Sequence, residues 1–286
     1  MNRIIFSLIF LALAAVSSAY EKLEFKGQIL NPGFQKPSAL ALAKGKVFVA
    51  DSKANVVFAF DAEGKLLKKI DGGLKAPMAL SFGGGKLYAA DTGNSRVAVF
   101  DGEGKFLWAF SSQGDAPGQL KAPEGIAYGP DERVYVSDTG NSRIAVFNAD
   151  GIYLYGFPVA KQDGVTKLNP AKIALNRSGD IIVSDPEKDM LQKYDRTGKL
   201  LKEYSMANNG AAVNKYGFFY VIDSKKGRVR EVSETGEVIG TFGTKGKGKS
   251  EFRNLRDIAV DESGLLYLCD EENKKVVMIK LEGAQT

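Results

Sequence analysis

The sequence predicts an all-β chain that folds as a six-bladed β-propeller with four strands in each blade. The hexapeptide Asp91-Thr92-Gly93-Asn94-Ser95-Arg96 recurs at residues 138–143, and an alternating apolar run follows each copy. Looser copies place an Asp after a short apolar run, which gives six units at intervals of 38 to 47 residues: Asp51, Asp91, Asp138, Asp185, Asp223 and Asp270. Repeats of about 40–45 residues with four short strands are typical of β-propellers.

The third unit illustrates the strand pattern of a blade. After Pro123, period-2 alternation with turn residues in between predicts strands over residues 125–128, 134–136, 143–147 and 152–155. Prolines mark the same start in three other units, at Pro37, Pro77 and Pro170, and the fifth and sixth units lack it. These two units are therefore degenerate copies.

The two ends of the chain are predicted to close the ring. The sixth unit stops after its third strand, residues 276–279, so its sheet is one strand short. Residues 23–30 precede the first unit and can supply that outer strand. Closure by strand pairing needs no disulfide, which agrees with the single cysteine, Cys269.

These units resemble the NHL repeat. The likeness rests on Pro-x-Gly-Ile-Ala, on Val-Tyr-Val-x-Asp-Thr-Gly-Asn-x-Arg-Ile-x-Val-Phe, and on the glycine-rich connector that ends at Leu120. The resemblance covers essentially all of the chain after residue 19 and implies a six-bladed propeller. The family includes scaffolds and RNA binders and, through related propellers, lyases and lactonases, so the fold alone does not give the function.

The first 19 residues have the pattern of a secretory signal peptide. Arg3 precedes an apolar run over residues 4–16, and small residues follow at 17–19. Thirteen residues are too few to span a bilayer as a helix. We therefore expect residues 20–286 to form one exported domain, periplasmic or secreted, without a transmembrane segment. Whether it forms an oligomer stays open.

Composition excludes several kinds of chemistry. The chain contains no His and one Cys, so Ser-His and Cys-His nucleophile systems, His-ligated metals and thiolate clusters are ruled out. Its 39 basic and 34 acidic residues give a net charge of +5, without the dense basic blocks of nucleic-acid binders. Nucleic acid is therefore an unlikely partner.

The repeated hexapeptide favours a structural role, because a turn is needed in every blade and a catalytic site only once. Gly93 and Asn94 are predicted to adopt positive φ, while Asp91 accepts backbone N–H groups and Arg96 pairs with a carboxylate. Cys269 takes a position where other units have Ala or Ser, so we expect a core thiol. A recurring aromatic position is likewise predicted to be core: Phe48, Tyr88, Tyr135, Tyr220 and Tyr267.

Oxygen-bearing side chains near the starts of the inner strands are candidates for a metal site. Related gluconolactonases and regucalcin, which the resemblance brings in, hold a divalent cation at the channel mouth with Glu, Asn and Asp. The corresponding candidates here are Glu124, Asn169, Asn208, Asn254 and Asp257. Such a set would take Ca²⁺ or another divalent cation. Other motifs of those enzymes are not visible, so polar strand starts without a metal are the alternative.

Basic residues gather on the connectors that lead from an outer strand to the next inner strand. These connectors share one face of a propeller, whereas the turns after the third strands are acidic and lie on the other face. The candidate partner-binding residues are Lys75, Lys121, Lys245, Lys247, Lys249, Arg253 and Arg256. They predict a docking face for an acidic protein or an anionic envelope polymer; solvated surface is the alternative.

Two functions follow from the sequence. The favoured one is a non-catalytic, extracytoplasmic binding or scaffold protein without a cofactor. The alternative is a hydrolase, lactonase or lyase that uses a divalent cation at the channel mouth.

Overall fold

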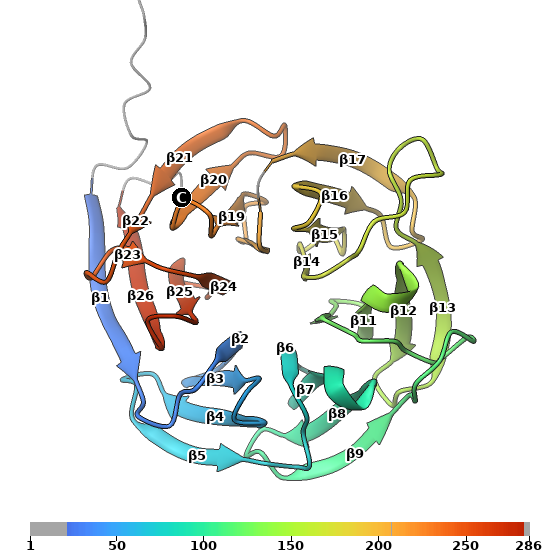
Figure 1. The fold of residues 1–286 in the computed structure, drawn as a ribbon, viewed down its shortest axis with the longest axis horizontal. Coiled ribbons are helices and arrows are strands. Elements are labelled where there is room, and N and C mark those ends of the chain that lie inside the picture. The colour runs from blue at the N-terminus through green and yellow to red at the C-terminus, as the bar shows by residue number, and fades with distance from the viewer. Residues whose placement is uncertain (1–21, 207, 283–286) are drawn as a thin grey trace, which may run out of the picture.

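Six four-stranded antiparallel sheets stand around a central axis in the part of the chain that the structure describes (Figure 1). The computed structural model describes residues 22–206 and 208–282. The predicted signal peptide, residues 1–19, lies outside them. Inner strands of consecutive blades contact one another around the ring, and the last of them contacts the first. The predicted six-bladed propeller is confirmed.

The first three blades follow the chain in order, from the inner to the outer strand. Blade 1 contains β2 (Pro37–Ala43), β3 (Lys46–Asp51), β4 (Val56–Asp61) and β5 (Leu66–Ile70). Blade 2 contains β6 (Pro77–Gly83), β7 (Lys86–Asp91), β8 (Arg96–Asp101) and β9 (Phe106–Phe110), with the 3₁₀ turn η1 (Thr92–Asn94). Blade 3 contains β10 (Gly125–Tyr128), β11 (Arg133–Asp138), β12 (Arg143–Asn148) and β13 (Tyr153–Pro158), with η2 (Thr139–Asn141).

The remaining blades include the two degenerate units. Blade 4 contains β14 (Ile173–Leu175), β15 (Ile181–Asp185), β16 (Met190–Tyr194) and β17 (Leu200–Ser205). Blade 5 contains β18 (Ala211–Val213), β19 (Phe219–Asp223), β20 (Arg228–Val232) and β21 (Val238–Phe242). A short parallel pair, β22 (Thr244–Lys245) and β23 (Glu251–Phe252), follows in the connector to blade 6.

Blade 6 is closed by both ends of the chain. It contains β24 (Leu255–Val260), β25 (Leu265–Asp270) and β26 (Lys275–Glu282), and β1 (Lys22–Leu30) pairs antiparallel with β26. The register places Phe25 opposite Ile279 and Ile29 opposite Val276. Ile29 is 1% exposed, so the N-terminal strand contributes to the core as well as to the sheet. The predicted closure is confirmed.

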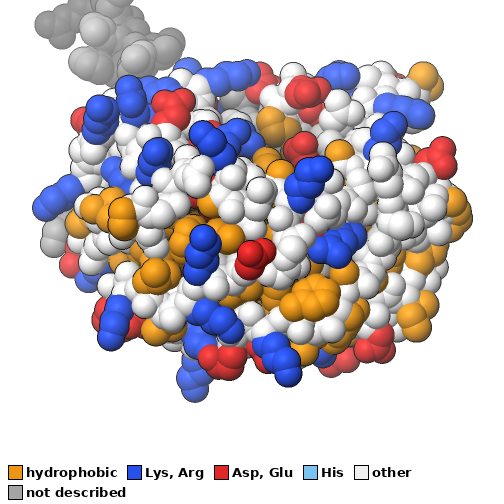
Figure 2. All heavy atoms as spheres, turned by 60° about the horizontal axis from the view of Figure 1, so that its bottom comes forward, with side chains coloured by type: hydrophobic (Ala, Val, Ile, Leu, Met, Phe, Trp, Pro, Cys, Tyr) orange, Lys and Arg blue, Asp and Glu red, His pale blue; other side chains and the backbone are white. Residues whose placement is uncertain are grey.

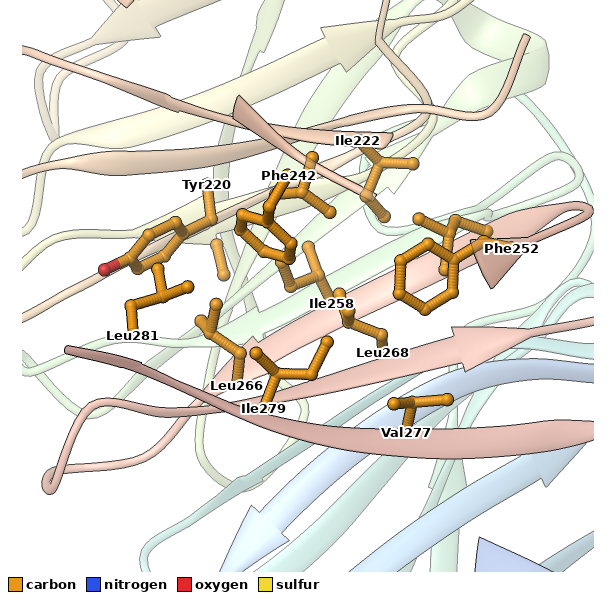
Figure 3. Packing of buried hydrophobic residues seen from close by; sticks show 13 residues of the cluster. Tyr220, Ile222, Phe242, Phe252, Ile258, Leu266, Leu268, Val277, Ile279 and Leu281 are labelled. Carbon is orange, nitrogen blue, oxygen red and sulfur yellow. The ribbon is translucent and has the colours of Figure 1, made fainter. Parts of the chain in front are cut away.

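Apolar side chains pack between neighbouring blades. Figure 3 shows the cluster between blades 5 and 6, where Tyr220 and Ile222 of β19 lie over Leu266 and Leu268 of β25. The recurring aromatic residues of the second strands are buried as predicted, and so is Cys269. Period-2 alternation produces this packing because each face of a blade meets a neighbouring blade. Burial of these faces stabilises the ring.

The hexapeptide turns confirm one prediction and correct another. Asp91 accepts the Lys75 backbone N–H at 2.7 Å and the Arg96 Nε at 2.7 Å, as predicted. The residue with positive φ is Ser95, at 50°, and the equivalent Ser142 has 52°; the prediction for Gly93 and Asn94 was wrong. Ser95 ends the 3₁₀ turn, so the left-handed residue comes after the Thr-Gly-Asn turn.

The outer wall has a mixed surface. Figure 2, in which the bottom of Figure 1 comes forward, shows Lys and Arg side chains interspersed with acidic and hydrophobic ones. The outer strands carry exposed large hydrophobic residues, among them Leu66, Leu67, Phe106 and Leu107. No helix in the described part of the chain is long and apolar enough to cross a membrane.

Candidate functional site

Two rings of residues surround the axis where the inner strands begin. The first, here called the inner ring, pairs with the same position of the second strand in each blade: Ala39, Ala79, Gly125, Lys172, Gly210 and Asp257. The residues directly before them form the outer ring: Ser38, Met78, Glu124, Ala171, Asn209 and Arg256. Four inner-ring positions are Ala or Gly, so Lys172 and Asp257 are the charged exceptions.

The side chain of Lys172 crosses the channel. From blade 4, its Nζ donates to the carbonyl oxygen of Met78 in blade 2 at 2.6 Å and to that of Ser38 in blade 1 at 3.3 Å. Desolvation by the surrounding protein lowers the pKa of Lys172, and the charge of Asp257 opposes this shift. The ammonium therefore ties three blades together near the axis.

Asp257 is the acidic counterpart on blade 6. Its Oδ2 accepts the backbone N–H of Leu40, in blade 1, at 2.7 Å. Burial raises the pKa of Asp257, while the charge of Lys172 acts in the opposite direction. Because a buried charge is costly without a counterion, each of these residues makes the other tolerable in the channel.

Lys172 separates two cavities. On one side, a channel cavity of about 350 Å³ is lined by inner-strand residues of all six blades, Asp257 included. On the other, a mouth cavity of about 220 Å³ is lined by side chains from blades 2 to 6. The mouth cavity contains four ionisable residues: Glu124, Lys172, Glu187 and Arg256.

Glu124 and Arg256 occupy equivalent outer-ring positions on blades 3 and 6, which lie opposite each other in the ring. No ion pair joins these two described residues, although both line the mouth cavity. The Arg256 Nε lies 3.8 Å from Glu271 Oε1, too far for a hydrogen bond, and both atoms are buried without a hydrogen-bond partner in the described chain. The mouth thus contains opposite charges that do not neutralise each other.

The five predicted metal candidates do not converge on one point. Glu124 and Asn169 line the mouth cavity, and Asp257 lines the channel cavity. The amide of Asn208 instead donates to the carbonyl oxygens of Met190 and Met206, and its neighbour Asn209 lines the mouth. The amide of Asn254 donates to Glu271. Within residues 22–206 and 208–282, no group of three or more Cys, Asp or Glu side chains is placed to hold a metal.

The lysine-rich connector between blades 5 and 6, residues 243–253, is a defined structure, here called the basic connector. The Glu251 carboxylate accepts the backbone N–H groups of Lys247 and Gly248 at 3.0 and 2.9 Å. Phe252 is fully buried and anchors the loop. Lys275, which is also buried, donates to the Gly248 carbonyl at 2.8 Å.

The lysines of the basic connector point their charges to solvent. Lys245, Lys247 and Lys249 are all exposed. Lys245 Nζ donates to the carbonyl of Arg253, and the Lys249 ammonium lies 5.4 Å from the Phe25 ring centroid. No acidic side chain of the described residues lies within 4.0 Å of these three ammonium groups. Their positive charges are therefore available to a partner.

The connector before blade 3, residues 111–121, has the same backbone arrangement but carries Gln113, Asp115 and Pro117 at the positions of Lys245, Lys247 and Lys249. Gln113 pairs parallel with Leu120, as Lys245 does with Phe252. Two side-chain contacts also recur at equivalent positions: Asn141 to Gly114 and Asn273 to Gly246, both at 2.9 Å. The lysines are thus not required to build this loop.

The other predicted partner-binding residues lie on the same face. Lys75 and Lys121 are exposed, and their backbone N–H groups bind Asp91 and Asp138 at 2.7 and 2.6 Å. Arg253 is exposed with its Nε 4.0 Å from Glu272, whereas Arg256 belongs to the mouth cavity. Six of the seven candidate partner-binding residues therefore lie on connectors, and the seventh, Arg256, lines the mouth cavity.

Lys172 was missed by the sequence reasoning. Its signal was present, because the residue two positions after the blade-opening proline is Ala39, Ala79 and Gly125 in blades 1 to 3 and Lys172 in blade 4. A long charged side chain at a position that otherwise carries Ala or Gly marks it as exceptional.

Comparison with known proteins agrees with this architecture. The family model described as the NHL repeat matches residues 120–147, which span the start of blade 3 through β12. The chain is a six-bladed β-propeller with an NHL repeat. The matched segment contains Glu124 of the mouth and the hexapeptide turn of blade 3. No curated protein matches the sequence.

Solved structures with the same fold include lyases. A streptogramin B lyase aligns at TM-score 0.68 and 16% identity, over 93% of this chain and 100% of its own. Virginiamycin B lyase from Staphylococcus aureus aligns at 0.66 and 13%, over 91% and 100%. A catalytically inactive His-to-Ala variant of the latter, with quinupristin, aligns at 0.66 and 14%, over 91% and 88%. At these identities the likeness establishes the fold.

Proposed function

We propose that this NHL-repeat propeller is an extracytoplasmic binding protein that docks an acidic protein through the basic connector. The observation that carries the proposal is the pair of matched connectors. One backbone arrangement is built twice, and only the copy between blades 5 and 6 carries Lys245, Lys247 and Lys249. Three exposed, unpaired ammonium groups attract a partner of opposite charge and orient its approach.

Export is part of this proposal and rests on the predicted signal peptide of residues 1–19. An acidic protein is favoured over a linear polyanion, because the basic residues lie on several separate connectors as well as on the basic connector. Lys75 and Lys121 lie on two of those connectors, apart from the basic connector. A folded partner can contact such separated charges at once, whereas a linear polymer favours a continuous basic stripe.

A lyase activity like that of the solved structures has less support. The inactivity of the His-to-Ala variant of virginiamycin B lyase contrasts with this sequence, which contains no His. A hydrolase or lactonase with Ca²⁺ at the mouth stays a prediction. Lys172 and Arg256 line the same cavity as Glu124 and Asn169, and their charges oppose a divalent cation there. Metal analysis of the purified protein, with Glu124→Gln and Asp257→Asn variants, tests it.

The docking proposal is tested with a connector-swapped variant, Lys245→Gln/Lys247→Asp/Lys249→Pro, which takes its residues from the matched connector. Immobilised wild-type and swapped chains are incubated with envelope and culture-medium proteins, and captured proteins are identified by mass spectrometry. We expect an acidic protein that the wild type retains at low salt and the swapped chain does not. The reverse variant, Gln113→Lys/Asp115→Lys/Pro117→Lys, places the three charges on the other connector and tests whether their position matters.

Two results would overturn the proposal. One is equal capture by the wild-type and swapped chains, and the other is a partner without excess acidic residues. Retention of a polysaccharide or polyphosphate in place of a protein would assign the basic connector to a polymer. Thermal melting of the swapped chain checks that its fold is intact.

A further inference from the structure

The mouth cavity contains donors and acceptors that the fold leaves unused. Arg256 has five N–H donors, none of which makes a hydrogen bond to a described residue. The Lys172 ammonium uses two of its three protons, on Met78 and Ser38. Across the mouth, the Glu124 carboxylate makes neither a hydrogen bond nor an ion pair with a described residue.

The unused groups are arranged by charge. Arg256 provides a positive group on blade 6, with the Lys172 ammonium at the floor of the cavity. Glu124 provides a negative group on blade 3, on the opposite side of the ring, and its charge acts on Lys172. Glu187 adds a second carboxylate, whose Oε2 accepts the Asn169 amide at 2.9 Å. The cavity thus has a cationic side and an anionic side.

Packing of the blades does not require a charged residue at the outer-ring positions of Glu124 and Arg256. Glu124 and Arg256 take the same outer-ring position, which in other blades is occupied by Ser38, Met78, Ala171 and Asn209. The other four blades form with an uncharged residue at this position, so neither the Glu124 carboxylate nor the Arg256 guanidinium is needed to form a blade. Glu124 has no ion-pair partner among the described residues, and Arg256 has a 3.8 Å ion pair with Glu271 that makes no hydrogen bond. Buried or half-buried charged groups with unused hydrogen-bonding capacity, at a position where packing does not require a charge, point to a ligand.

We infer that the mouth cavity binds a small zwitterion of the amino-acid class, with its carboxylate at Arg256 and Lys172 and its ammonium at Glu124. Arg is suited to the carboxylate because its fork can donate two parallel hydrogen bonds. The apolar part of the ligand lies against the remaining lining: Met78, Ala171 and Pro186.

The size of the cavity limits the ligand. Drug-sized ligands occupy pockets of roughly 300–1,000 Å³. The mouth cavity, at about 220 Å³, suits a smaller molecule, and Lys172 closes it toward the channel. The inference is independent of the docking proposal, because it concerns different residues and a different kind of ligand.

Calorimetric titration of the purified full chain tests the inference. The probes are glycine, β-alanine and 4-aminobutyrate, which differ in the separation of their charges, with L-alanine and L-valine to probe the apolar lining. Propionate and propylamine each present one of the two charges. We expect at least one zwitterion to bind about tenfold or more tightly than both single-charge probes, because only a zwitterion satisfies both sides of the cavity.

Variants locate the binding. Arg256→Gln and Glu124→Gln should each weaken the best zwitterion about tenfold or more. Exposed charges elsewhere provide matched controls, Arg177→Gln and Glu237→Gln, which should leave binding unchanged. If Arg256→Gln does not fold, Glu124→Gln and the shifts of the Thr139 and Ala171 amide signals on titration decide the matter. The inference is overturned if no zwitterion exceeds propionate and propylamine, or if Glu124→Gln binds as the wild type does.

Discussion

The Lys172 ammonium on blade 4 lies 2.6 Å from the carbonyl oxygen of Met78 on blade 2, across the axis of the ring. Together with Asp257 on blade 6, it places a charged pair in an inner ring that otherwise contains Ala and Gly. Lys172 lines both the mouth cavity and the channel cavity, Asp257 lines the channel cavity, and their hydrogen bonds link blades that do not pair along their sheets.

Substituting Lys172 alone should lower the free energy of unfolding more than substituting Lys172 and Asp257 together. Lys172→Ala leaves the Asp257 carboxylate in the channel without its counterion, and we expect a loss of about 1–3 kcal/mol in the free energy of unfolding. Lys172→Ala/Asp257→Ala restores the residue type of the other blades and should recover most of that loss. Urea denaturation of the single and double variants measures the coupling. Strictly additive losses would contradict the account.

The Asp223 carboxylate should make stability depend on pH. Burial alone would raise its pKa, but a hydrogen bond from Arg228 and the charge of Arg230 outweigh burial, and the pKa is lowered. A lowered folded pKa contributes stability above the unfolded value of about 3.9, and this is lost as pH falls through the folded value.

Asp223→Asn should therefore destabilise the protein by about 1–3 kcal/mol at neutral pH, with a smaller difference near pH 3. Chemical denaturation of both proteins across this range measures it. The exposed Asp150→Asn is a suitable control. A difference that does not change with pH would show that Asp223 acts through packing alone.

The N-terminal strand should be needed for a stable ring. Two neighbouring residues of β1 separate packing from strand pairing: Ile29 is 1% exposed and Leu30 is 60% exposed. Ile29→Ala should cost about 2–5 kcal/mol, and Leu30→Ala should have little effect. Deletion of residues 22–30 should lower the melting temperature further, because it also leaves β26 unpaired. Melting of the deletion at the wild-type temperature would refute closure by β1.

The fold could be predicted because its determinants are local and repeated. Alternation identified the strands of blade 3, and the missing strand after residues 276–279 pointed to residues 23–30. The position of the positive φ could not be read from residue type, because Ser95 adopts it through the geometry of the 3₁₀ turn that precedes it. The general preference of glycine and asparagine for positive φ predicted Gly93 and Asn94, whereas Ser95 adopts it.

The site was harder to predict because it depends on register between blades. Glu124 and Asp257 were identified as polar strand starts, but a one-residue difference separates buried Asn208 from Asn209 at the mouth. The opposition of Glu124 and Arg256 requires knowing that blades 3 and 6 face each other. Lys172 could have been found by comparing the residues at one position in all six units.

The dissociation constant of the captured acidic partner, measured for wild-type and connector-swapped chains from about 50 to 200 mM salt, tests the central claim most directly. Loss of three exposed charges should weaken binding about tenfold or more at low salt and make it less sensitive to salt, because screening then has fewer charges to act on. The same affinity and the same salt dependence for both chains would contradict docking through Lys245, Lys247 and Lys249.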